Sequence, residues 1–123
     1  MSSVEKFKAA LKALSHALEF EKQARKDDFY YGGIAKAFEV AIEYAWKYFR
    51  AEVVASGLEA PSPRDAIKSA GKIGIIDDVE AWLEFLRIRN IAVHDYLGVT
   101  QDQYLASIQK FLVLARKVNS RKG

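Results

Sequence analysis

The chain has 123 residues, of which half are apolar and 28% are charged, a balance typical of one domain with a single hydrophobic core. It has no cysteine, which excludes disulfides, thiolate metal sites and a cysteine nucleophile. Two prolines and seven glycines are too few for the turns of an all-β fold. The N-terminal segment lacks the apolar core of a signal peptide, and no apolar run approaches the ~20 residues that cross a bilayer. We therefore expect a soluble, cytoplasmic protein without membrane contacts.

The net charge of +3 comes from the C-terminal end of the chain. Of 19 basic residues, four lie within residues 116–123, where there is no acid, and the other 15 are balanced by 16 acidic residues. We expect one domain over residues 1–118, followed by a basic tail at 119–123. Such a tail suits contact with phosphates, but solvated chain ends often have the same composition.

Apolar residues recur at spacings of three and four along most of the chain, which indicates amphipathic helices. The first predicted helix covers residues 4–18. The second is long: Asp27 or Asp28 caps its start, its apolar stripe covers residues 34–53, and Gly57 ends it.

Ser62, Pro63 and Asp65 form the clearest helix start in the chain. Serine caps the free backbone N–H groups, proline suits the first turn, and the acid interacts favourably with the positive end of the helix. A short helix is predicted to follow and to stop at Gly71 or Gly74.

Two further helices complete the predicted fold. Residues 77–78 start a fourth helix over 79–93, and Thr100 with Gln103 forms a capping box for a last helix over 104–115. The sequence therefore predicts an all-α protein, an antiparallel up-and-down bundle of four long helices and one short helix.

Few residues are arranged for catalysis. There are only two histidines and no metal-binding spacing, phosphate loop or serine nucleophile elbow, so we expect no metal and no cofactor. We interpret His16, on the first predicted helix, as a surface residue without chemistry.

The segment from Arg87 to Tyr96 is the exception. A projection at 100° per residue places Asn90 in the middle of the apolar face of the fourth helix, where unmet amide groups cost about 1–3 kcal/mol each. Arg89 and His94 lie on opposite borders of this face, about 140° apart. A straight helix cannot aim both at one small ligand. Either the helix is distorted near His94 or the two residues meet their counterparts across a symmetric dimer, and we favour the dimer.

A purely structural interpretation of the same segment stays open. Arg89 can pair with a nearby acid, Asn90 can join two helices, and His94 can bind a backbone carbonyl near the helix end. A single R-x(4)-H spacing is too common to exclude this interpretation.

The order Arg89-Asn90-x-x-x-His94-x-Tyr96 resembles the R-x(4)-H-x-Y signature of the HEPN superfamily, small helical bundles that are often dimers. Three further stretches resemble the nucleotidyltransferase substrate-binding family within that superfamily. They are Phe38-Glu39-x-x-x-Glu43-x-x-Trp46-Lys47, Ser62-Pro63-Arg64-Asp65-x-Ile67 followed by Gly74-Ile75-Ile76-Asp77-Asp78, and Trp82-Leu83. Together the stretches cover roughly residues 30–115 in the family's order.

This resemblance implies a partner and a set of site residues. Members of the family are typically encoded beside a minimal nucleotidyltransferase and are thought to supply the substrate-binding half of a two-subunit enzyme. In related toxin–antitoxin pairs, the R-x(4)-H residues form a metal-independent ribonuclease site, and the partner can nucleotidylate the tyrosine. Carried over, Arg89, Asn90 and His94 are catalytic candidates, Tyr96 is the nucleotidylation candidate, and Arg87, Arg89 and His94 are substrate-binding candidates.

Three functions therefore stand. We favour a substrate-binding subunit that pairs with a separately encoded minimal nucleotidyltransferase, in a toxin–antitoxin-like system. The second is a ribonuclease toxin acting across a homodimer, in which two copies of His94 share the acid and base roles and Arg89 holds the phosphate. The third is a purely structural helical interaction module. RNA or a nucleotide is an implied ligand, although the nearly neutral body of the chain argues against a strongly basic RNA groove.

Overall fold

A computed structural model describes residues 1–94 and 100–122, with side chains described for residues 1–92 and 100–118. The described residues form six helices and no strand. The helices are α1 (Ser3–Leu18), α2 (Glu21–Ala24), α3 (Asp28–Ala55), α4 (Pro63–Lys72), α5 (Val79–His94) and α6 (Gln101–Lys122). The predicted all-α class is confirmed, with one short helix, α2, more than the sequence predicted. The boundary expected at residue 118 falls inside α6.

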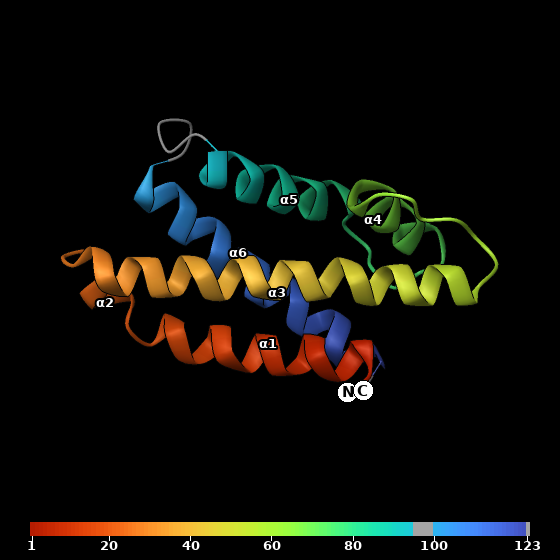
Figure 1. Cartoon of the computed structure of the whole chain (residues 1–123), viewed down its shortest axis with the longest axis horizontal. Helices are drawn as coiled ribbons and strands as arrows, with labels where there is room; N and C mark the ends of the chain where they lie inside the picture. The colour runs from red at the N-terminus through yellow and green to blue at the C-terminus, as the bar shows by residue number, and fades with distance from the viewer. Residues whose placement is uncertain (95–99, 123) are drawn as a thin grey trace.

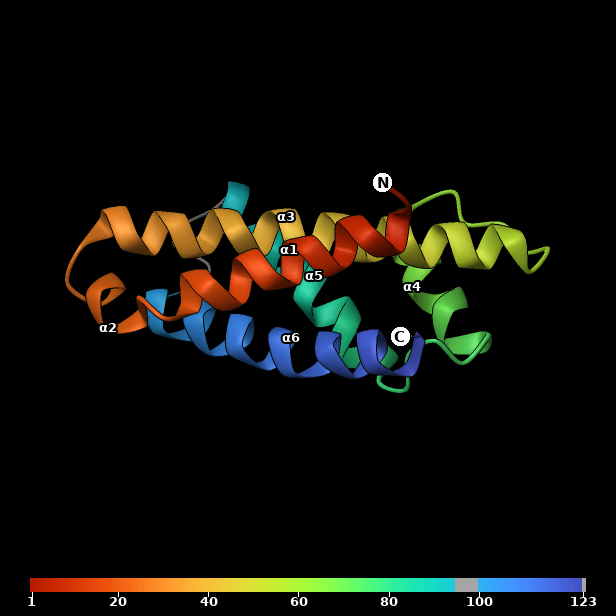
Figure 2. The same ribbon diagram turned by 90° about the horizontal axis from the view of Figure 1, so that it is seen from below.

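The long helix α3 is the centre of the bundle. It contacts α1, α2, α4 and α5, while α6 contacts α1 and α5. Figure 1 shows α4 and α5 along one side of α3 and α1 along the other. In both views the helices α1, α3, α5 and α6 run in alternating directions, as in an up-and-down bundle (Figures 1 and 2).

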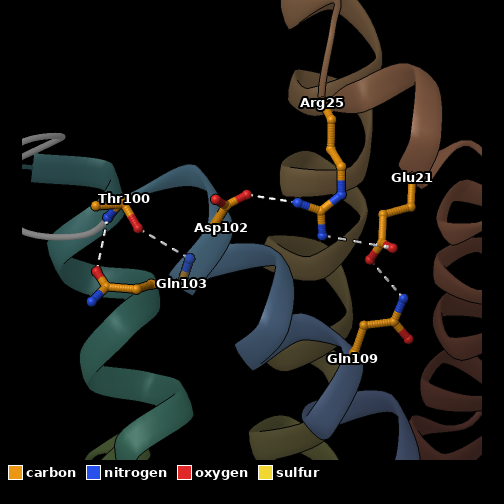
Figure 3. Close-up of polar contacts among 6 residues, drawn as sticks. All are labelled: Glu21, Arg25, Thr100, Asp102, Gln103 and Gln109. Carbon is orange, nitrogen blue, oxygen red and sulfur yellow. Dashed lines mark hydrogen bonds and ion pairs between the residues drawn. The ribbon is translucent and has the colours of Figure 1, made fainter.

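Most helix starts follow from local side-chain chemistry. The predicted caps are confirmed at Asp27, whose Oδ1 accepts from the backbone N–H of Phe29 at 2.9 Å, and at Ser62, whose Oγ accepts from that of Asp65 at 3.1 Å. The Thr100 capping box is also present, with bonds of 3.0 and 3.1 Å to Gln103 (Figure 3). These caps fix where α3, α4 and α6 begin, and Ser62 and Pro63 at the start of α4 also line the groove described below.

The short helix α2 attaches the α1–α3 connection to α6. Arg25, the C-cap residue that follows α2, forms an ion pair with Asp102 at 2.7 Å, and Glu21 in the helix accepts a hydrogen bond from Gln109 at 2.9 Å (Figure 3). Four residues are too few to show an apolar period, which explains why the sequence pattern did not predict this helix.

Aromatic side chains from α3, α5 and α6 fill the core. The ring of Trp82 contacts those of Phe49, Phe85 and Phe111 in edge-to-face geometry, with centroids 5.0 to 5.7 Å apart. All four side chains are at most 2% exposed. This cluster holds α5 against the rest of the bundle, and thereby fixes one wall of the groove.

Gly71 allows α4 to pass close to the start of α5. The sequence predicted a helix stop at Gly71 or Gly74; the helix continues through Gly71, and the chain turns at Gly74, whose φ is +82°. A Cβ on Gly71 would clash with Cγ2 of Val79, a side chain with little freedom at χ1.

We therefore expect Gly71→Ala to lower the free energy of unfolding by about 1–3 kcal/mol, although alanine is the better helix former. The added Val79→Ala removes the clashing methyl group, and should restore part of the loss. Urea denaturation of the two single variants and the double variant measures this coupling. A Gly71→Ala protein as stable as the wild type would show that the two helices separate at no cost.

Tyr48 carries a buried hydroxyl into the core. Its side chain is 2% exposed and stacks on Phe7, and its Oη has no hydrogen bond among the described residues. Burial raises the pKa of Tyr48 to about 12, because the phenolate is disfavoured away from water, and the carboxylate of Glu52 adds to this effect.

We expect Tyr48→Phe to raise the free energy of unfolding by about 1 kcal/mol at neutral pH, because an unsatisfied polar group leaves the core. Above pH 10 the unfolded tyrosine loses its proton while the folded one keeps it, so wild-type stability falls as the pH rises from 10 towards 12. The variant lacks this part of the decline. Urea denaturation of both proteins at pH 8 and pH 11 measures this difference. Equal losses of stability by the wild type and the variant between the two pH values would contradict the prediction.

Candidate functional site

A groove with a volume of about 400 Å³ lies between α3, α4 and α5. Helix α3 contributes Ile42, Glu43 and Trp46 to its wall. The first turn of α4 contributes Ser62, Pro63 and Arg64. The helices α4 and α5, which flank the groove, run along the upper edge of the molecule in Figure 1. The groove thus brings together residues from two of the sequence stretches described above, those over residues 38–47 and 62–67.

Helix α5 supplies the third wall, with Leu83, Leu86, Arg87, Arg89 and Asn90. Four of these follow the spacing i, i+3, i+4 and i+7 from Leu83, which places them on one face of the helix. The groove is therefore apolar along the two leucines and positively charged towards the C-terminal half of α5.

Asn90 does not lie in the buried apolar face of α5, where the projection placed it. The side chain is exposed at the groove, and the buried face of the helix consists of Ala81, Trp82, Phe85 and Ala92. The error arose because α5 carries apolar residues on two faces, and Leu83 on the groove side is only half-buried. The Asn90 amide joins no helices among the described residues; its Oδ1 accepts a hydrogen bond from Nη1 of Arg89 at 3.2 Å.

The carboxylate of Glu43 is fully engaged at the α3 wall. Its Oε2 accepts from Nε1 of Trp46 at 3.1 Å, and its Oε1 forms an ion pair with Nζ of Lys47 at 3.2 Å. These contacts hold the indole ring in place and neutralise the acid.

Arg87 is likewise neutralised by its neighbour on α5. Its Nε donates to Glu84 at 2.9 Å, and its Nη2 donates to the second oxygen of the same carboxylate. The paired carboxylate raises the pKa of Arg87, and the arginine lowers the pKa of Glu84. Arg87 therefore contributes little free positive charge to the groove.

Arg64 and Arg89 have no acidic partner in the part of the chain that the structure describes. Nε of Arg89 is buried and has no hydrogen-bond partner in that same part of the chain, while Arg64 is exposed at the start of α4. The groove consequently carries two uncompensated guanidinium groups and no uncompensated carboxylate among its described residues.

The remaining predicted site residues are not all placed. His94 ends α5, but its side chain lies outside the described residues, as does Tyr96 entirely. His16 lies on the surface, as predicted, and its Nδ1 is 3.2 Å from Oε2 of Glu19. Within the described part of the chain, no three or more potential ligands are grouped to hold a metal ion.

Residues 2–122 match the family described as nucleotidyltransferase substrate binding protein like. The chain belongs to this family. A comparison with curated proteins finds no match. The family match extends the resemblance seen over residues 30–115 to nearly the whole chain, and it includes every residue that lines the groove. None of the described helices is both long and apolar enough to cross a membrane.

The nucleotidyltransferase substrate-binding family was expected from the sequence, but three groove residues were not assigned a role. Glu43, Trp46 and Arg64 all lie in the stretches that carried the resemblance. The resemblance of those stretches to the family pointed to these residues. However, the spacing of residues along the sequence does not show that α3 and α4 lie beside α5. Only the fold brings them to one groove.

Proposed function

We propose that this protein binds the acceptor substrate of a separately encoded minimal nucleotidyltransferase, and that the groove between α3, α4 and α5 is the binding site. One observation supports this most strongly: stretches that resemble the family from three parts of the chain meet in this groove, through Trp46, Arg64 and Arg89. An open groove lined by a few charged side chains and an aromatic ring is typical of a ligand-binding site.

The chain acts in this proposal by positioning, not by activating the nucleotide. The partner holds the nucleotide, and this protein presents the acceptor to it. Holding two reactants together in a suitable orientation removes much of the entropic barrier to their reaction. The locked Trp46–Glu43–Lys47 contacts give the groove a fixed wall for that task.

Assembly with the transferase tests the proposal directly. We expect the purified protein and a minimal nucleotidyltransferase from the same genome to form a stoichiometric complex in size-exclusion chromatography with light scattering. Trp46→Ala should leave assembly intact and lower nucleotidyl transfer, since Trp46 lines the groove. Phe29→Ala, which removes an aromatic ring 81% exposed elsewhere on α3, is the control and should transfer normally. Failure to assemble would contradict the proposal.

We also propose, on the resemblance, that the subunit is a homodimer within a toxin–antitoxin-like system. Light scattering of the protein alone checks the dimer, and a monomer at micromolar concentration would contradict it. A dimer would bring two copies of His94, the last residue of α5, into one assembly.

A metal-independent ribonuclease is the second candidate, because the guanidinium of Arg89, which has no ion pair among the described residues and lines the groove, also suits a phosphodiester. RNA incubated with the protein in EDTA decides between the two functions, with His94→Ala beside the wild type and light scattering on both. We expect no cleavage. Cleavage by the wild type that is lost in a folded His94→Ala protein would make the chain a ribonuclease.

A further inference from the structure

We infer that the groove between α3, α4 and α5 is an anion site, and that the acceptor substrate is anchored there by a phosphate monoester between Arg64 and Arg89. The identity of the ligand as the acceptor substrate rests on the proposed function. The anion site itself is a property of this chain alone and can be measured without a partner.

The described lining of the groove carries an excess of positive charge. Glu43, the one acid among the described lining residues, gives one oxygen to Trp46 and the other to Lys47. Arg87 is bound through two donors to Glu84. Two guanidinium groups, those of Arg64 and Arg89, are left without an ion pair in the described part of the chain.

The guanidinium of Arg89 is only partly paired among the described residues. Buried donors without partners are rare in folded proteins, because they lose water without gaining a bond. Nε of Arg89 is such a donor among the described residues, while Nη1 of the same guanidinium donates to Asn90 at 3.2 Å. The side chain of Arg89 lines the groove, so an anionic oxygen bound there would accept from its guanidinium, and the planar fork of arginine matches the oxygens of a phosphate.

The N-terminus of α4 adds to the positive potential of the groove. Ser62 and Pro63 line the groove, so the positive end of this ten-residue helix lies at the same place as Arg64. The Ser62 hydroxyl is already used, since it donates to Oδ2 of Asp65 at 2.7 Å and accepts from the Asp65 N–H. The helix end therefore adds favourable potential, partly offset by Asp65, and the arginines supply the hydrogen bonds.

A phosphate monoester fits this arrangement better than other substrate classes. A polycation would meet two free guanidinium groups and no free carboxylate among the described lining residues. A neutral acceptor would leave the charges of both arginines without a counter-charge among the described lining residues. A phosphate monoester carries enough negative charge to engage both arginines at once.

Trp46 provides the readout for a direct test. It is half-buried at the groove, whereas Trp82, the second tryptophan, is 2% exposed in the core. We would titrate the purified protein with inorganic pyrophosphate, as the probe for the phosphate group, and follow tryptophan emission. We expect a saturable change, absent in Trp46→Phe, and no change with spermidine as the cationic probe.

Two variants that each remove one exposed positive charge give the matched comparison. Arg64→Gln should weaken pyrophosphate binding at least tenfold, because it removes a charged donor at the groove. Lys12→Gln, on the exposed face of α1, should bind like the wild type. No saturable change, or equal binding by the two variants, would overturn the inference.

The two proposals fail separately. If pyrophosphate does not bind while Trp46→Ala still lowers transfer by the assembled complex, the anion site is wrong and the substrate-binding function stands. If pyrophosphate binds as expected and no transferase complex forms, the anion site stands and the proposed function falls.

Discussion

Arg89→Met is expected to weaken pyrophosphate binding at least tenfold while leaving the free energy of unfolding unchanged or about 1 kcal/mol higher. The variant removes the charged donors that face the groove, and it also removes a buried N–H without a partner among the described residues. Methionine retains an unbranched apolar chain in place of the arginine stem. Trp46 emission measures the binding, and urea denaturation measures the stability.

The structural interpretation of Arg89 predicts the opposite result. If Arg89 serves only to stabilise the bundle, Arg89→Met should lose stability and leave the groove unaffected. Arg87→Met is the control, because Arg87 lines the same groove and is already neutralised by Glu84. It should weaken pyrophosphate binding much less than Arg89→Met.

Phe111→Ala is expected to lower the free energy of unfolding by about 3–5 kcal/mol. The side chain is fully buried, and its ring contacts those of Phe38, Trp82 and Phe85 at centroid distances of 5.2 to 5.5 Å. Truncation leaves a cavity where α3, α5 and α6 meet. For a domain with a typical stability of about 5–15 kcal/mol, this loss is a large fraction of the total.

Urea denaturation followed by circular dichroism measures this loss, and Phe29→Ala supplies a matched control. Phe29 is 81% exposed near the start of α3, so its truncation should change the stability by no more than about 0.5 kcal/mol. Similar losses for the two variants would mean that the core does not depend on the Phe111 cluster.

The sequence predicted those parts of the fold that depend on local chemistry. The caps at Asp27, Ser62 and Thr100 each need only a few neighbouring residues, and all three are present. The four-residue helix α2 was missed, because its contacts with α6 join residues far apart in the chain, as between Arg25 and Asp102.

The candidate site depended more on tertiary structure. The motif alone identified Arg89, and the structure places it at the groove. The sequence could not show which side of α5 is buried, because Leu83 and Phe85 make both sides of the helix apolar. The projection therefore placed Asn90 on the buried side, although it is exposed at the groove. Arg64 reaches the site through the packing of α4 against α3 and α5, which no local pattern records.

Nucleotidyl transfer by the reconstituted two-subunit enzyme is the most direct test of the groove as the substrate site. The assay would follow label from an α-³²P nucleoside triphosphate into small molecules of a deproteinised extract of the source cells. We predict that complexes with Arg64→Gln transfer at least tenfold less label than the wild type at low acceptor concentration, while those with Lys12→Gln transfer normally. Equal transfer by the Arg64→Gln and wild-type complexes, both fully assembled, would contradict the account.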